Sequence, residues 1–141
     1  MPDVCVVEDL PAPVEVAWAC LADFGDMSLW SPDSNVLKVE GSEAGCVRTV
    51  DSADGRYVEK CEAYSAENFS FDYSLVESPH PYTAYLGTVT LTAIDEQKCS
   101  IEWKCDFELP GVKKALVAKA IEEVYRDYFI MHLRKSLEKG A

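Results

Sequence analysis

The sequence predicts an α+β fold in which a strongly curved antiparallel sheet of seven strands wraps around a long C-terminal helix. The first observation is that short segments alternating apolar and polar residues recur from residue 4 to residue 108. The second is that the segment after Pro110-Gly111 reads as one amphipathic helix to about Lys139. The strands are expected at residues 4–10, 36–40, 46–52, 56–63, 69–76, 83–93 and 99–107.

Composition and charge are those of a globular chain of 141 residues, which we expect to form one domain over residues 1–141. Hydrophobic residues make up 48% of the chain, enough to build a core. The formal net charge of −12 argues against a nucleic acid or an anionic membrane as partner, because both would be repelled. With no leader and no transmembrane run, we expect no membrane insertion, a cytoplasmic location and a monomer or weak homodimer.

The cysteines and histidines do not form a metal-binding pattern. None of the six cysteines belongs to a C-x-x-C pair, and the only histidines are His80 and His132. We therefore expect neither a metal nor any other cofactor. Most of the cysteines have apolar neighbours, which fits reduced and buried thiols. The sequence leaves open whether any two of them form a disulfide.

Two short helices are expected between the first two strands. Pro13 suits the first turn of a helix over residues 14–24, because its missing N–H costs nothing there. A second short helical turn is expected at residues 25–30, stopped by Ser31-Pro32. Trp30, at the end of that turn, is expected to plug one end of the sheet.

The dipeptide Asp54-Gly55 predicts a tight hairpin between the third and fourth strands. With this dipeptide as the loop, Arg48 faces Cys61, and Glu59 becomes a diagonal neighbour of Arg48 within reach of an ion pair. The opposite face is more charged and is expected to meet solvent. Seven side chains are expected on the inward face: Arg48, Val50, Ser52, Tyr57, Glu59, Cys61 and Ala63. Of these, Ser52 and Tyr57 lie nearest the turn and are expected at a rim.

The later strands and the last helix carry further side chains that are expected to face inward. Two prolines make residues 78–81 a loop, and Gly87 beside Tyr85 leaves room for a bend or a ligand. The strand side chains expected inward are Phe69, Phe71, Tyr73, Leu75, Tyr85, Val89, Leu91 and Trp103. The predicted apolar stripe of the helix is Val117, Ile121, Val124, Tyr125, Tyr128, Phe129 and His132. We interpret His132 as a satisfied core residue.

Local motifs then occur in a characteristic order along the chain. They are Ala12-Pro13 with Val16 and Trp18, Asp23-Phe24, Trp30-Ser31-Pro32, Gly45-Cys46-Val47-Arg48, Val58-Glu59, Phe71-Asp72-Tyr73-Ser74-Leu75 and Ile101-Glu102-Trp103. Together with the order of elements, they resemble the START-like superfamily, also called SRPBCC or Bet v 1-like. Within it the chain is similar to the polyketide cyclase/dehydrase and lipid-transport branch. The resemblance implies a helix-grip fold and a single ligand-binding domain.

Inside that branch the chain is similar to plant lachrymatory factor synthases, although it is shorter and its flanking residues differ. In those enzymes an arginine, a glutamate and a tyrosine in the cavity carry a proton rearrangement of a small sulfenic acid. Their patterns are matched by Gly45–Arg48, by the strand around Glu59, and by Tyr85 within Tyr-x-x-Thr-Val. The resemblance therefore implies Glu59, Arg48 and Tyr85 as catalytic candidates.

Each of these candidates also has a purely structural interpretation. Burial raises the pKa of a carboxyl group, an adjacent arginine lowers it, and a carboxyl balanced between the two can act as general acid or base. Glu59 and Arg48 could instead form a structural pair, or orient a ligand, which is the role we favour. Tyr85 could donate a hydrogen bond to a ligand oxygen or simply pack.

We expect a mainly apolar cavity between sheet and helix, the usual form of a small-molecule site. The predicted ligand-binding residues are Arg48, Glu59, Phe71, Tyr73, Tyr85, Val89, Trp103, Ile121, Tyr125 and Tyr128. The first hypothesis is binding or transport of a small hydrophobic molecule, aromatic, lipid or polyketide-like. The second is a cofactor-free cyclase, dehydratase or isomerase with Glu59 as general acid/base, Arg48 stabilising negative charge and Tyr85 assisting. The third is a partner-binding module whose loop around His80 closes on the ligand.

Overall fold

The computed structural model describes residues 1–140 and contains one antiparallel sheet of seven strands in the order β1-β7-β6-β5-β4-β3-β2. The strands are β1 (Val4–Leu10), β2 (Asn35–Glu40), β3 (Val47–Ser52), β4 (Gly55–Ser65), β5 (Ser70–Glu77), β6 (Thr83–Asp95) and β7 (Lys98–Glu108). The helical elements are α1 (Val14–Leu21), α2 (Lys114–Val124), η1 (Tyr125–Ile130) and α3 (Met131–Lys139). The predicted α+β class, the seven strands and the long C-terminal helix are confirmed.

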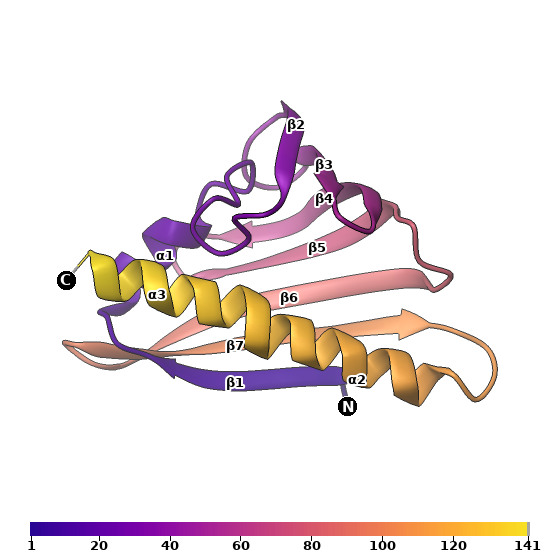
Figure 1. The fold of residues 1–141 in the computed structure, drawn as a ribbon. Helices are drawn as coiled ribbons and strands as arrows, with labels where there is room; N and C mark the ends of the chain where they lie inside the picture. Colours follow the sequence, from indigo (N-terminus) through magenta and orange to yellow (C-terminus); the bar gives the residue numbers. More distant parts are fainter. Residues whose placement is uncertain (141) are drawn as a thin grey trace.

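The C-terminal helix lies across the sheet, as Figure 1 shows. Strand β1 pairs with β7, which brings the first and last strands of the chain together and leaves β2 at the far edge. Side chains such as Val6, Ile101 and Leu133 are almost completely buried and belong to the core. No helix among the described residues is long and apolar enough to cross a membrane.

Only one helix lies between β1 and β2, so the second predicted helix is not formed; residues 27–31 make one isolated helical turn, in which the Ser31 N–H donates to the Met27 backbone oxygen. Helix α1 ends at Leu21, and the chain then makes separate turns. The carboxylate of Asp23 accepts a hydrogen bond from the Gly25 N–H, and that of Asp26 accepts from both N–H and hydroxyl of Ser28. Side chains that bond to their own backbone in this way compete with helix formation. Trp30 is buried, and its ring lies 5.2 Å from that of Trp103.

The β3–β4 hairpin has a different loop from the predicted one. Its two loop residues are Ala53-Asp54, and Gly55 is the first residue of β4, with φ +135°. A side chain there would be strained, and its Cβ would lie 2.9 Å from Pro79. Arg48 therefore pairs with Glu59 and not with Cys61, a displacement of two residues. An even displacement keeps every side chain on its predicted face, so the inward assignment of both residues holds.

One side chain of β4 that was predicted to face inward does not, because the strand contains a β-bulge. The register shifts between Cys61 and Ala63, so that Ala63 pairs with Asp72 and is exposed, contrary to the prediction. Tyr64 takes the inward position instead. Its ring lies 5.6 Å from that of Trp18, and its hydroxyl donates to the backbone oxygen of Ala22. An inserted residue reverses the alternation of a strand, which a strict period of two does not anticipate.

The C-terminal helix contains a six-residue π segment, η1, at its centre. A π turn bonds residue i to i+5, so the buried face moves by one residue along the helix. The buried side chains are accordingly Tyr125, Ile130, Leu133 and Leu137. Six of the seven residues of the predicted stripe line the cavity between helix and sheet, and Val124 does so while 44% exposed. His132 is half-buried and bonds through Nδ1 to the backbone oxygen of Tyr128.

Candidate functional site

A cavity of about 590 Å³ lies between the sheet and the C-terminal helix. One side is formed by β3, β4, β5 and β6, and the other by α2 and η1. The segment between α1 and β2 contributes Met27, Ser31, Asp33 and Ser34. Most of the wall is apolar or aromatic. Of the ten predicted ligand-binding residues, six line the cavity: Glu59, Tyr73, Tyr85, Ile121, Tyr125 and Tyr128.

The other four predicted residues, Arg48, Phe71, Val89 and Trp103, are not part of the cavity wall. Each is at most 3% exposed, with its side chain enclosed by protein. Sheet alternation places them on the inward face, but neighbouring side chains and the loop after α1 cover them. Whether the six lining residues bind a ligand stays a prediction.

Glu59 is the one charged side chain buried in the cavity wall, with an exposed fraction of 9%. Its Oε1 accepts a hydrogen bond from Arg48 Nε at 2.8 Å, and the two residues are direct partners across β3 and β4. No residue among 1–140 donates a hydrogen bond to its Oε2. Glu59 therefore has one carboxylate oxygen held by the protein and one free to bond a molecule in the cavity.

Arg48 lies behind Glu59 and is 2% exposed. Besides its bond to Glu59, it donates through a terminal guanidinium nitrogen to the backbone oxygen of Phe24 at 2.8 Å. The guanidinium carbon also lies 3.9 Å from the centre of the Phe24 ring, a cation–π contact. The segment after α1 thus completes the pocket of Arg48. These contacts fix the arginine and, through it, the orientation of the Glu59 carboxylate.

Three tyrosine hydroxyls are linked in the interior of the cavity. Tyr73 and Tyr85 are bonded at 2.9 Å, and Tyr85 is bonded in turn to Tyr125 of η1. Trp103 Nε1 donates to the Tyr73 hydroxyl at 3.0 Å. Because an indole N–H only donates, the Tyr73 oxygen must accept there. The three hydroxyls make two hydrogen bonds with one another, so one of the three protons is left for another acceptor.

The tyrosine chain stays protonated across the neutral range. Burial raises the pKa of Tyr73 to about 12, and the nearby Glu59 charge acts in the same direction. Burial raises the pKa of Tyr85 and of Tyr125 well above the ordinary value for a phenol. Neutral phenols in a mostly apolar wall are hydrogen-bond donors, which suits them to a carbonyl or hydroxyl oxygen of a ligand.

A second polar cluster lies at the mouth of the cavity. Tyr57 donates to Asp54 Oδ2 at 2.5 Å, and its hydroxyl lies 2.6 Å from His80 Nε2. The His80 ring stacks on Tyr82, with ring centres 5.2 Å apart. The hairpin loop and the β5–β6 loop are therefore joined at the mouth by side chains, and all four residues line the cavity. Gating by the His80 loop stays a prediction.

Sequence reasoning missed the contribution of the segment between α1 and β2. Asp33 Oδ2 accepts from the Tyr128 hydroxyl at 2.8 Å, and the Ser31 and Ser34 hydroxyls are bonded to each other at 2.7 Å. The segment has no periodic pattern, so nothing local indicates which side chains turn inward. The Asp33–Tyr128 contact joins residues 95 positions apart. The only signal was the turn at Ser31-Pro32.

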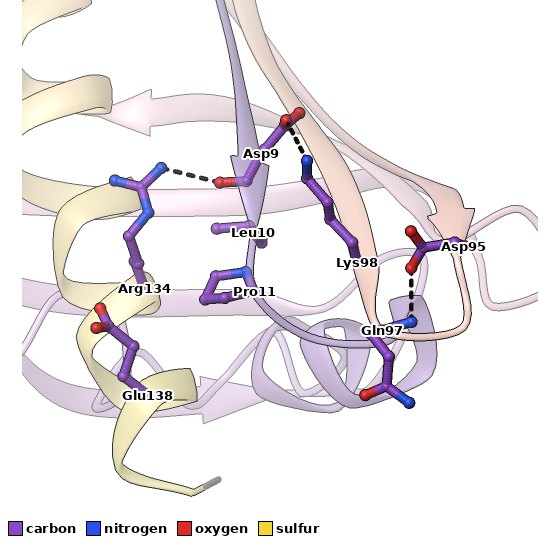
Figure 2. Close-up of a pocket in the computed structure, with 8 residues that line it drawn as sticks. All are labelled: Asp9, Leu10, Pro11, Asp95, Gln97, Lys98, Arg134 and Glu138. Atoms are coloured by element: carbon purple, nitrogen blue, oxygen red, sulfur yellow. Dashed lines mark hydrogen bonds and ion pairs between the residues drawn. The ribbon is translucent and has the colours of Figure 1, made fainter.

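A second hollow, of about 650 Å³, lies on the surface between the end of β1, the β6–β7 turn and α3 (Figure 2). Its two basic side chains already have partners. Lys98 Nζ lies 3.2 Å from Asp9, and Arg134 donates to the Asp9 backbone oxygen at 2.9 Å. None of its lining residues is aromatic. We therefore place the candidate site in the cavity and not in this hollow.

Fold and cavity together define the class of helix-grip domains that enclose a pocket between sheet and helix. The chain belongs to the family described as polyketide cyclase/dehydrase and lipid transport, which matches residues 1–138. The resemblance predicted from the motifs is thereby confirmed. No curated protein sequence matches the chain significantly.

Solved structures share the fold at low sequence identity. An uncharacterised protein from Bacillus thuringiensis is 21% identical, with a TM-score of 0.81 over 94% of this chain and 96% of that one. A protein from Nitrosospira multiformis is 23% identical, with a TM-score of 0.79 over 94% and 93%. Norcoclaurine synthase from Thalictrum flavum, in complex with dopamine and hydroxybenzaldehyde, is 11% identical, with a TM-score of 0.75 over 98% and 87%.

Proposed function

We propose that this protein binds a small hydrophobic molecule in the cavity between its sheet and its C-terminal helix. The supporting observation is a mainly apolar cavity of about 590 Å³ into which a few polar groups converge. Glu59 and the tyrosine chain are among its most buried polar groups, since Glu59, Tyr73, Tyr85 and Tyr125 are each at most 9% exposed. A pocket of this size and composition is typical of small-molecule sites.

The polar end of the ligand lies between the free oxygen of Glu59 and the tyrosine hydroxyls. Glu59 accepts from a donor of the ligand, and a tyrosine donates to an acceptor. Arg48 does not touch the ligand; it acts by holding the Glu59 carboxylate. The apolar body of the ligand packs on Ile121 and Phe129 of the helix, which removes apolar surface from water on both sides.

Narrowing the cavity should weaken binding without unfolding the protein. Ala120 is exposed and lines the cavity from α2, whereas Ala115 is exposed on the same helix outside it. We expect Ala120→Trp to weaken binding of the neutral dye N-phenyl-1-naphthylamine about tenfold or more, about 1.4 kcal/mol, because the indole fills the mouth. Ala115→Trp should leave the affinity within about twofold. Dye fluorescence measures both; equal affinities in the two variants would contradict binding in the cavity.

A second candidate function is cofactor-free proton transfer. It is favoured by the free Oε2 of Glu59 together with neutral phenols in the same cavity. For a β,γ-unsaturated carbonyl compound, Glu59 takes a proton from the carbon between the carbonyl group and the C=C bond. The C–H electron pair forms a new C=C bond, and the carbonyl π pair moves to the oxygen. A tyrosine hydroxyl donates a hydrogen bond to this oxygen. Glu59 then returns the proton to the far carbon of the original C=C bond, and the carbonyl group forms again. The net reaction is an isomerisation.

The isosteric variant Glu59→Gln separates an enzyme from a carrier. It keeps the volume and an oxygen for Arg48 but removes the base, so turnover should fall about 100-fold or more if Glu59 transfers protons. Binding of the same compound should change far less. The assay follows turnover and binding over a panel of aromatic and polyketide-like carbonyl compounds. Tyr85→Phe serves as a second probe of the donor; no turnover by the wild type would leave only the carrier.

A further inference from the structure

The cavity wall carries acidic groups but no lysine or arginine. Among the described residues, its lining includes the carboxylates of Asp33, Asp54 and Glu59, and the one basic side chain is His80. His80 is already close to Asp54, with Nε2 3.1 Å from its carboxylate. A molecule entering the cavity therefore passes acidic groups at the mouth and meets another in the interior.

The nearest guanidinium cannot compensate an acidic ligand. Arg48 is enclosed behind Glu59, with its described hydrogen bonds going to that carboxylate and to the Phe24 backbone, and a ring lies over its face. Its positive charge balances that of Glu59 and leaves the mouth carboxylates uncompensated. Asp33 is exposed and is bonded to the Tyr128 hydroxyl and to no cation among residues 1–140.

This arrangement discriminates by ligand charge. A carboxylate or phosphate in the cavity would lose its hydration without gaining a cationic partner, which is costly. It would also be repelled by a protein of net charge −12. An ammonium group gains the free oxygen of Glu59, an unusual acceptor because its residue is nine-tenths buried. The rings of Tyr73, Tyr85 and Tyr125 around the same cavity favour a cation as well.

We propose that the ligand is a hydrophobic amine, protonated at neutral pH, whose ammonium group donates to Glu59 Oε2. Its apolar body lies between the sheet and the helix, and the carboxylates at the mouth attract it on entry. The proposal rests on the proposed binding function of the cavity and names the chemical class that the cavity selects.

Three naphthalene probes of similar size and different charge test this selection. Isothermal titration calorimetry at pH 7 compares 2-naphthylmethylamine, 2-naphthylmethanol and 2-naphthoate. We expect the amine to bind about tenfold or more tightly than the alcohol, and the carboxylate to bind more weakly than both. Raising the salt concentration should weaken binding of the amine and leave the affinity for the alcohol unchanged, because only binding of the amine depends on charge.

Two variants test whether the preference for the amine arises at Glu59. Glu59→Gln should remove the advantage of the amine over the alcohol, while the affinity for the alcohol stays within about threefold of the wild-type value. Asp95→Asn, which changes an exposed carboxylate outside the cavity, should leave the affinity for the amine unchanged. Equal weakening of amine and alcohol by Glu59→Gln would contradict the proposed ion pair.

The outcomes distinguish the two proposals. If the alcohol or the carboxylate binds as tightly as the amine, the charge selection is overturned and the cavity function stands. The same conclusion follows if the neutral dye binds and none of the three naphthalenes does. If neither the dye nor any naphthalene binds, both proposals are overturned.

Discussion

Replacing Arg48 with methionine should lower the free energy of unfolding by about 3–5 kcal/mol. The substitution keeps much of the apolar stem but leaves the Glu59 carboxylate buried without its cation. It also removes the hydrogen bond to the Phe24 backbone oxygen and the stacking on the Phe24 ring. Denaturant unfolding followed by circular dichroism measures the change.

The exposed pair between Arg56 and Asp51 provides the matched control. It lies in the same hairpin, with side chains 56% and 47% exposed, and Arg56→Met should leave the free energy of unfolding nearly unchanged. Combining Arg48→Met with Glu59→Leu should recover part of the loss, because no unpaired charge is then buried. A loss for Arg48→Met no larger than for Arg56→Met would show that the buried pair does not hold this wall together.

Replacing Gly87 with alanine should destabilise the protein by about 1–3 kcal/mol and displace the Tyr73 ring. Gly87 pairs with Tyr73 across β5 and β6, and an added Cβ would lie 2.6 Å from two ring carbons and 2.9 Å from the hydroxyl oxygen. The space predicted at Gly87 for a bend or a ligand is therefore occupied by this ring. The displaced hydroxyl should also lose its bonds to Tyr85 and Trp103, which weakens binding in the cavity.

Two further variants isolate this contact. Gly140→Ala, whose added Cβ meets nothing closer than 3.7 Å, should leave stability nearly unchanged. In a Tyr73→Ala background the Gly87→Ala substitution should cost much less than in the wild type, because the ring that it strikes is gone. Thermal unfolding of the four proteins in that cycle gives the coupling. Additive losses of stability would mean that the backbone at residue 87 requires glycine and that contact with the Tyr73 ring does not.

The inward position of Glu59, Tyr73 and Tyr85 could be predicted from sequence because strand alternation is a local property. A period of two assigns a face to each residue without knowledge of its partner strand. The assignment survived even where the hairpin register was displaced, since the displacement was even. It failed at Ala63, where a bulge reversed the alternation.

The lining of the cavity could not be predicted to the same extent. Inward residues such as Arg48 and Trp103 were expected to reach the ligand, but other side chains cover them. Coverage depends on which loop crosses the open face, and the loop between α1 and β2 has no periodic signal. That no lysine or arginine among residues 1–140 lines the cavity likewise emerges only once Arg48 is seen to lie behind Glu59.

Local patterns were thus enough to define the seven strands, the long helix and the face of each key side chain, because they depend on neighbours in the chain. Tertiary contacts decided everything that depends on distant residues. No local pattern indicated the bulge at Ala63, the π segment at Tyr125–Ile130 or the enclosure of Arg48 by Phe24. These contacts determine which polar groups meet the cavity, and so which molecules it can bind.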